Sequence, residues 1–382
     1  MLDSTNEIAT EQLFFSGSEY FSSLLEDIGN SQLSVDMETY IFSFDLIGTR
    51  ILEALTAAAA RGVIVRIMVD GAGTPYWDSN LIKRLERAGG DTRVFHPFPW
   101  RLWQWSRSVI LAPYLVKAFY LLLKINSRNH RKVCIIDQKI VYVGSFNVSQ
   151  NHLDHDGNSR GWRDTGVRLS GIEPRDILLA FESSWSHRPM QERIRQFFRY
   201  VSTNPIFRLN NNWYRRRILH KDLLHRIKNC KHRIWITNAY FVPDNFLLRR
   251  LIEAARNGVD VRILLPAQSD VAFMPWASKA FYERLLKSGV RIFEYLPVML
   301  HAKTLILDDW MIIGSSNLNH RSLLHDLEID VNIKSTKAKN SLVEQFLIDL
   351  SNSREIGLDK WHKRSIYKRV VGNLILYLKY FI

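Results

Sequence analysis

One pattern of strand, helix and strand occurs twice in this chain of 382 residues, and it constrains the fold more than any other feature. Each copy has a short apolar segment with a tyrosine, a helix-forming stretch, a glycine, and an apolar run of the form Val-x-Val-Arg-Ile. The parts lie at 39–42, 51–55 and 61–69 in the first copy and at 239–242, 251–258 and 259–265 in the second. Gly62 and Gly258 stand where helix C-termini favour glycine, and the closing runs are typical of buried strands.

Strand–helix–strand units of this kind predict the α/β class, with helices on both faces of a sheet. A unit that occurs twice predicts two pseudo-symmetric halves, each with a mixed, mostly parallel sheet. We place the halves at residues 1–200 and 201–355, followed by a separate C-terminal segment at 356–382.

A second shared pattern follows each unit, at 130–147 and at 301–317. Both copies read His-x-Lys, four residues, Asp, five or six residues, then Gly-Ser-x-Asn. The members are His130, Lys132, Asp137, Ser145 and Asn147 in the first copy and His301, Lys303, Asp308, Ser315 and Asn317 in the second.

Strand geometry predicts that these side chains meet. Residues i and i+2 of a strand point to the same face, so His130 and Lys132 should project together, as should His301 and Lys303. The sequence Asp137–Lys139 reads as a turn, after which a second strand returns Ser and Asn to the His/Lys face. The second copy is one residue shorter. We place this deletion in the hairpin turn, because a loss inside a strand would flip the following side chains.

Two such sets suit the chemistry of a phosphodiester. One neutral imidazole can attack phosphorus, and a second, protonated imidazole can donate to the leaving oxygen. The lysines and asparagines would balance charge on the phosphoryl oxygens. This scheme needs no metal and no cofactor.

At these residues the chain resembles the phospholipase D superfamily, whose signature is His-x-Lys-x4-Asp-x6-Gly-Ser-x-Asn. The resemblance implies an active site at the interface of the two halves, with Asp137 and Asp308 as part of the catalytic motifs. It implies His130 as nucleophile and His301 as acid and base, although the residues themselves leave that order open.

The resemblance also implies that a downstream carboxylate orients each catalytic histidine. Asp164, in Trp-Arg-Asp-Thr, and Glu328, in Leu-Glu-Ile, are the matching positions. A carboxylate on one ring nitrogen selects the tautomer and supports the imidazolium. Arg321 and Ser322 follow the second motif, and both a phosphate-binding and a structural role remain open for them.

The net charge of +14 predicts a polyanionic partner, either nucleic acid or an anionic membrane surface. The stretch at about 95–128 is rich in Trp, Phe and Tyr, and no Asp or Glu occurs from Arg93 to Ile136. The segment 356–382 is basic and apolar. Neither segment has the ~20 apolar residues of a spanning helix, so we expect both to lie at a membrane interface.

The segments 39–42, 69–71, 162–165 and 294–303 resemble bacterial cardiolipin synthases, and the chain looks like a shorter, peripheral subgroup. The resemblance implies transfer of a phosphatidyl group to phosphatidylglycerol at the cytoplasmic membrane, on its cytoplasmic face. An anionic phospholipid membrane is then the partner, rather than nucleic acid. Alternatives are a hydrolytic phospholipase D, a nuclease of the superfamily, and a catalytically silent membrane-binding protein. The oligomeric state is left open.

Overall fold

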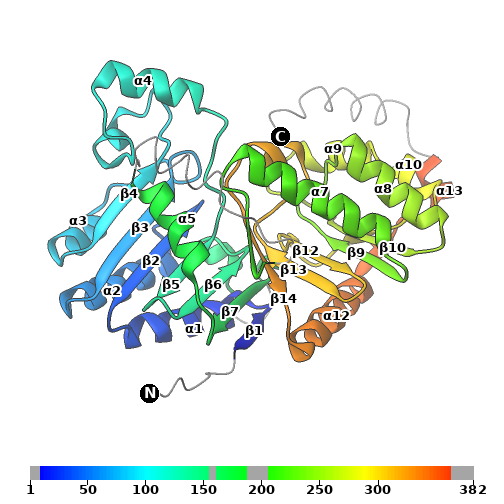
Figure 1. Ribbon diagram of the computed structural model, residues 1–382, viewed down its shortest axis with the longest axis horizontal. Helices are drawn as coiled ribbons and strands as arrows, with labels where there is room; N and C mark the ends of the chain where they lie inside the picture. Colours follow the sequence, from blue (N-terminus) through cyan, green and yellow to red (C-terminus); the bar gives the residue numbers. More distant parts are fainter. Residues whose placement is uncertain (1–8, 155–160, 187–204, 363–382) are drawn as a thin grey trace. The chain divides into compact units, whose positions relative to one another are not determined.

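The computed structural model describes residues 9–154, 161–186 and 205–362 (Figure 1). The chain forms two compact units. The first contains Met1–Leu153 and Gly166–Tyr200, and the second contains Asp154–Thr165 and Val201–Ile382. The structure differs from the predicted division at residue 200 in one segment. The short segment that ends at Thr165 belongs to the second unit, although the chain on both sides of it belongs to the first.

The first unit is built on a seven-stranded sheet with the order β1-β7-β6-β5-β2-β3-β4. Its strands are β1 (Thr10–Phe14), β2 (Ser34–Thr39), β3 (Ile64–Asp70), β4 (Asp91–Phe95), β5 (Val133–Ile136), β6 (Ile140–Gly144) and β7 (Gly166–Ser170). Its helices are α1 (Gly17–Asn30), α2 (Leu46–Ala60), α3 (Asn80–Arg87), η1 (Leu102–Arg107), α4 (Tyr114–Leu123), η2 (Gln150–His152) and α5 (Arg175–Trp185).

The alternation of side chains along β3 shows how both faces of this sheet are covered. Val65 and Ile67 are buried in one core together with apolar residues of α1, α2 and α3. Arg66 points to the other face, where its guanidinium lies 4.8 Å from the Phe181 ring of α5. Figure 1 shows α5 on the opposite side of the sheet from α1 and α2.

The second unit is built on an eight-stranded sheet with the order β15-β11-β10-β9-β12-β13-β14-β8. Its strands are β8 (Phe207–Leu209), β9 (Arg233–Thr237), β10 (Asp260–Pro266), β11 (Arg291–Tyr295), β12 (Thr304–Leu307), β13 (Trp310–Gly314), β14 (Ile329–Ile333) and β15 (Ser353–Glu355). Its helices are α7 (Trp213–Asn229), α8 (Asn245–Arg256), α9 (Met274–Lys279), α10 (Tyr282–Leu286), α11 (His320–Leu324), α12 (Thr336–Ser351) and α13 (Leu358–His362).

The layers of the second unit repeat those of the first. Ile234 and Ile236 of β9 share a core with α7 and α8. Trp235, between them, points to the other face and stacks on Phe346 of α12 with ring centroids 5.0 Å apart. The predicted repeat is therefore confirmed: β2-α2-β3 and β9-α8-β10 are equivalent units.

Both sheets are mixed, as predicted, but the expectation that they are mostly parallel is wrong. Among the described strands, the parallel pairings are β2–β3 and β3–β4 in the first sheet and β9–β10 and β10–β11 in the second. The remaining neighbours pair antiparallel. The reason is that the parallel part is limited to each repeated unit and the strand that follows it, β4 or β11, while the motif hairpins and the remaining strands add the antiparallel part.

The missing residue of the second motif lies in its hairpin turn, as predicted. In the first hairpin Ile136 pairs with Ile140, and in the second Leu307 pairs with Trp310. One turn therefore has three residues and the other has two, while the strand register before and after the turn is the same.

Part of the predicted C-terminal segment belongs to the second unit. Trp361 of α13 is buried, and its ring lies 4.9 Å from that of Tyr282 in α10. Aromatic packing thus holds residues up to His362 in this unit, and the predicted segment from 363 to 382 lies outside the described residues. Within the described part of the chain, no helix combines the length and apolar character needed to cross a membrane.

Candidate active site

The first His-x-Lys motif lies at the carboxyl end of β2. Strand β5 runs antiparallel to β2, with Val133 opposite Glu38, so the residues just before Val133 lie beside Tyr40. The strand begins three residues after His130, and the motif precedes it. The ammonium of Lys132 donates to the carbonyl of His130 at 2.7 Å.

The ring of Tyr40 brings the two motif side chains together. It lies 5.0 Å from the His130 ring and 5.3 Å from the Lys132 ammonium. Asn147 reaches the same place from β6, since its Oδ1 accepts the backbone N–H of Ile41 at 3.3 Å. Ser145 is fully buried one residue after β6. Histidine, lysine and asparagine of the first motif therefore meet as predicted at one edge of the sheet.

The second motif repeats this arrangement beside Tyr240. Lys303 donates to the carbonyl of His301 at 2.5 Å, and its ammonium lies 5.9 Å from the Tyr240 ring. The ring of Tyr240 lies 6.3 Å from that of His301. Its hydroxyl donates to the carboxylate of Asp270 at 2.7 Å.

A buried carboxylate is paired with the second histidine, but it is Asp164, which precedes this motif, and the expectation of a downstream carboxylate for His301 is wrong. Oδ1 of Asp164 lies 2.7 Å from Nδ1 of His301, and both side chains are almost fully inaccessible to solvent. With Nδ1 bonded to the carboxylate, Nε2 is the nitrogen left to exchange a proton. The carboxylate also stabilises the imidazolium electrostatically.

Backbone pairing places Asp164 there. The N–H groups of His301 and Ala302 donate to the carbonyl of Arg163 at 2.8 and 3.0 Å, and the N–H of Arg163 donates to Met299 at 2.9 Å. The Arg163 guanidinium forms a buried ion pair with Asp349 of α12 at 2.8 Å. Arg163 therefore forms an isolated parallel bridge with Leu300, which places Asp164 beside the second motif.

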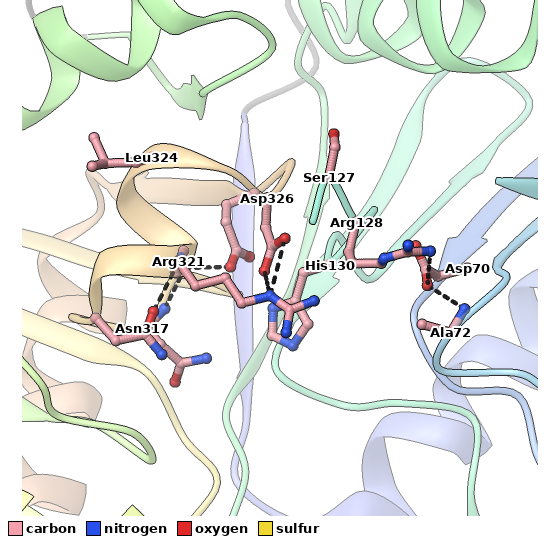
Figure 2. A network of polar contacts seen from close by, with 12 residues as sticks. Asp70, Ala72, Ser127, Arg128, His130, Asn317, Arg321, Leu324 and Asp326 are labelled. Carbon is pink, nitrogen blue, oxygen red and sulfur yellow. Dashed lines mark hydrogen bonds and ion pairs between the residues drawn. The ribbon is translucent and has the colours of Figure 1, made fainter. Parts of the chain in front are cut away.

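Glu328 is held by two hydroxyl groups. Ser315 donates to one carboxylate oxygen at 2.5 Å, and Ser322 donates to the other. Ser322 also accepts the N–H of Asn317 at 2.9 Å. Ser322 thus links Asn317 to the buried carboxylate, which favours the structural role for this residue. Arg321 donates to Asp326 at 3.1 Å (Figure 2).

The motif aspartates do not lie with the histidines. Asp137 is in the hairpin turn at the far end of β5, a strand of roughly 13 Å, and has a φ of 51°. It accepts the N–H groups of Gln32, Leu33 and Ser34 at 2.9, 2.7 and 3.0 Å. Asp308 accepts those of residues 231–233 in the same way. The predicted catalytic set therefore separates into a histidine–lysine end and an aspartate end, and we assign the aspartates to the turns.

Burial changes the electrostatics of the second motif. Desolvation lowers the pKa of Lys303 to about 8, although the carboxylates of Asp164, Glu328 and Asp270 oppose this shift. The ammonium is therefore charged at neutral pH and loses its proton under mildly alkaline conditions.

The motifs alone did not identify four further residues of these sites: Tyr40, Tyr240, Arg163 and Asp349. The tyrosines did carry a signal, because each stands at the same position of the repeated strand–helix–strand unit. Arg163 lies in the segment 162–165 that carries the family resemblance, although no role followed from it, and Asp349 carried no signal. Across the described ranges, no three His, Cys, Asp or Glu side chains gather into a group that could hold a metal ion.

Comparison with known proteins agrees with this geometry. The family model described as "Cardiolipin synthase, PLD-like domain" matches residues 24–160 and 223–350. A cardiolipin synthase of Clostridium perfringens (strain SM101 / Type A) is 33% identical over 375 residues, which is 95% of this chain and 75% of that protein. Cardiolipin synthase 2 of Bacillus anthracis is 30% identical over 370 residues, covering 93% of this chain and 67% of that protein.

Solved structures show the same fold at low identity. The crystal structure of phosphatidylserine synthase from Haemophilus influenzae Rd KW20 matches with a TM-score of 0.67 and 14% identity, covering 96% of this chain and 92% of that one. Polyphosphate kinase from Porphyromonas gingivalis matches with a TM-score of 0.58 and 14% identity, covering 89% of this chain and 50% of that one.

Two mixed sheets flanked by helices, each with a His-x-Lys hairpin, define a protein of the phospholipase D-like class. The family match in both halves and the relatives with at least 30% identity go further. The chain belongs to the cardiolipin synthase family, and the predicted resemblance is confirmed.

Proposed function

We propose that this protein is a phosphatidyltransferase that converts two molecules of phosphatidylglycerol into cardiolipin and glycerol. The observation that carries the proposal is the pair of equivalent His-x-Lys hairpins, of which the second has its histidine bonded to a buried carboxylate. The names of its relatives supply the lipid product. We further propose that both motifs act on one phosphorus.

In the first step, Nε2 of a neutral His130 attacks the phosphorus of the donor lipid. The bond from phosphorus to the glycerol oxygen breaks, and protonated His301 gives its Nε2 proton to that oxygen. Asp164 supports the imidazolium that this step requires. Lys132, Lys303, Asn147 and Asn317 stabilise charge on the phosphoryl oxygens. Glycerol leaves, and the phosphatidyl group remains on His130.

In the second step, the terminal hydroxyl of another phosphatidylglycerol attacks the phosphohistidine. His301, now neutral, takes the hydroxyl proton, the bond from phosphorus to nitrogen breaks, and cardiolipin is released. Glu328, buried and held by Ser315 and Ser322, is the second supporting carboxylate in this proposal.

We propose an anionic phospholipid membrane as the partner, with the protein bound peripherally on the cytoplasmic face. The relatives are synthases of a membrane lipid, and the net charge of +14 favours an anionic surface. Flotation with vesicles that contain phosphatidylglycerol checks the association, and protease protection in inside-out vesicles checks the face.

The deciding experiment incubates purified protein with phosphatidylglycerol vesicles in the presence of a chelator. We expect cardiolipin and glycerol in equal amounts. Phosphatidic acid without cardiolipin would identify a hydrolase. Cleavage of plasmid DNA without lipid turnover would identify a nuclease.

A further inference from the structure

The aromatic insert of the first unit begins and ends at the catalytic edge of its sheet. Strands β2, β3 and β4 are parallel, so their carboxyl ends share one edge. The insert leaves from this edge after Phe95 and returns to it at His130, which lies beside Tyr40. In Figure 1, α4 (cyan) lies beyond the ends of β3 and β4.

The base of the insert is firmly attached to this edge. Arg128 lies 3.9 Å from the buried carboxylate of Asp70, at the end of β3 (Figure 2). Asp70 also accepts the N–H of Asn129 at 2.8 Å and that of Ala72 at 2.7 Å. Near the start of the insert, Arg101 donates to the carbonyl of Gly71 at 2.6 Å. The orientation of the insert on the sheet is therefore determined by buried polar contacts.

The outer part of the insert is apolar and exposed. Leu115 and Phe119 of α4 are 86% and 64% exposed. The other exposed apolar side chains in and beside this helix are Leu111, Tyr114, Val116, Leu122 and Leu123. A helix of ten residues is about 15 Å long, half of what a bilayer core of ~30 Å requires. Its length and exposure suit insertion at the surface of a bilayer, parallel to its plane.

Two exposed tryptophans belong to the same insert. Trp100 and Trp103 lie before η1, or within it, and are 62% and 53% exposed. Tryptophan favours the depth at which lipid headgroups meet the acyl chains. The stretch from Arg93 to Ile136 has Lys117 and Lys124 in and after α4 and no acidic residue. This charge is complementary to an anionic lipid surface and would repel a cationic one.

We infer that α4 and the Trp100–Trp103 loop insert into the surface of an anionic phospholipid bilayer and hold the catalytic edge of the first unit towards it. The inference rests on the proposed function, because a lipid substrate explains why His130 and the docking surface share one edge. It adds to the proposed function by identifying this insert as the part of the protein that contacts the bilayer.

The test compares vesicle binding of three full-length proteins: the natural one, Leu115→Ser with Phe119→Ser, and a control with Leu33→Ser and Ile64→Ser. Leu33 and Ile64 are 60% and 63% exposed, but they lie at the amino ends of β2 and β3, on the opposite edge of the same sheet. Vesicles contain equal amounts of phosphatidylglycerol and phosphatidylcholine, and flotation gives the partition constant.

We expect the α4 variant to lose roughly 100-fold or more in partition constant, because burial of each such side chain is worth about tenfold or more. The control should stay within about twofold. The natural protein should bind vesicles of phosphatidylcholine alone roughly tenfold more weakly, since nearby basic residues are attracted to anionic lipid. Equal binding to both vesicle types would overturn the assignment to an anionic surface.

Assays in detergent micelles of phosphatidylglycerol separate this inference from the proposed function. Equal turnover by all three proteins in micelles, with weak vesicle binding of the α4 variant alone, supports the inference. The inference is overturned if the α4 variant binds vesicles within threefold of the natural protein. It is also overturned if this variant loses self-association but keeps vesicle binding, because α4 would then contact a second protein molecule. If the natural protein binds vesicles but forms no cardiolipin, the proposed function is wrong, while the inference about membrane contact still holds.

Discussion

The two units carry one motif in two settings. In both, a lysine donates to the carbonyl of the preceding histidine, and a tyrosine from the repeated unit lies against the pair. The turns of the hairpins differ by one residue. The connectors differ more: 68 positions separate Gly62 from His130, and 43 separate Gly258 from His301. The equal strand register thus keeps the histidine–lysine end of the two hairpins alike, while the turns and connectors differ in length.

The largest expected effect is on the histidines, because the comparison holds that both motifs are needed. His130→Ala and His301→Ala should each lower turnover of phosphatidylglycerol by more than about 1000-fold. The roles separate with a phosphatidyl ester of p-nitrophenol, whose leaving group needs no proton. On this ester, His301→Ala should accumulate a phosphohistidine and His130→Ala should not. A phosphohistidine on the His130→Ala protein would reverse the assigned roles.

Next in size is the carboxylate of the second motif. Asp164→Asn should lower kcat by about 100- to 10,000-fold, because the imidazolium of His301 loses its countercharge. Asp164→Glu should recover part of the loss and move the pH profile. Asp260→Asn, which removes a carboxylate paired with Arg262 elsewhere in the second unit, serves as the control. A kcat within threefold of the natural value for Asp164→Asn would contradict the positioning role.

The pH dependence sharpens the comparison between the two lysines. Burial lowers the pKa of Lys303 to about 8, so its positive charge is present below that pH and lost above it. We expect kcat/KM to fall on the alkaline side with an apparent pKa near 8. The guanidinium of Lys303→Arg stays charged, so the kcat/KM of the activity that remains in this variant should fall only at higher pH. Lys132→Arg should not shift the alkaline fall. A limb that stays in place in Lys303→Arg would assign it to another group.

The smallest expected effect on activity is at the turn aspartates. Burial raises the pKa of Asp137, but the N–H groups of Leu33, Gln32 and Ser34 outweigh it, and the net shift is downward. Because the pKa of Asp137 is lower in the folded protein than its unfolded value of 3.8, the ionised carboxylate stabilises the fold at pH values above 3.8. This stabilisation is lost as the pH falls through the folded-state pKa. Asp137→Ala and Asp308→Ala should each lower the free energy of unfolding by roughly 1–2 kcal/mol at pH 7. Urea denaturation measures this.

The same two variants test whether the aspartates take part in catalysis. Both turns lie at the far end of their strands from the histidines, so kcat should stay within about threefold of the natural value. A loss of kcat as large as that expected for the histidines, in protein that remains folded, would return the aspartates to the catalytic set.

Much of each site could be predicted because its residues are close in sequence. His130, Lys132 and Asn147 belong to one hairpin, and the alternation of side chains determines which of them share a face. The same logic located the deletion in the turn that begins at Asp308. The sequence misled where the repeated unit was taken to represent a whole sheet. Each unit and the strand after it, β4 or β11, are parallel, but the other strands of each sheet pair antiparallel.

The sequence by itself determined the two halves, the two hairpins and the chemical groups that each presents, because these follow from spacing along single strands. Only the tertiary structure decided that Asp164 is paired with His301, 137 positions away, and that Arg163 and Asp349 hold it there. It also decided that the exposed face of α4 lies at the edge that carries His130. Such pairings depend on how strands and helices pack, and residues far apart along the chain leave no periodicity from which they could be predicted.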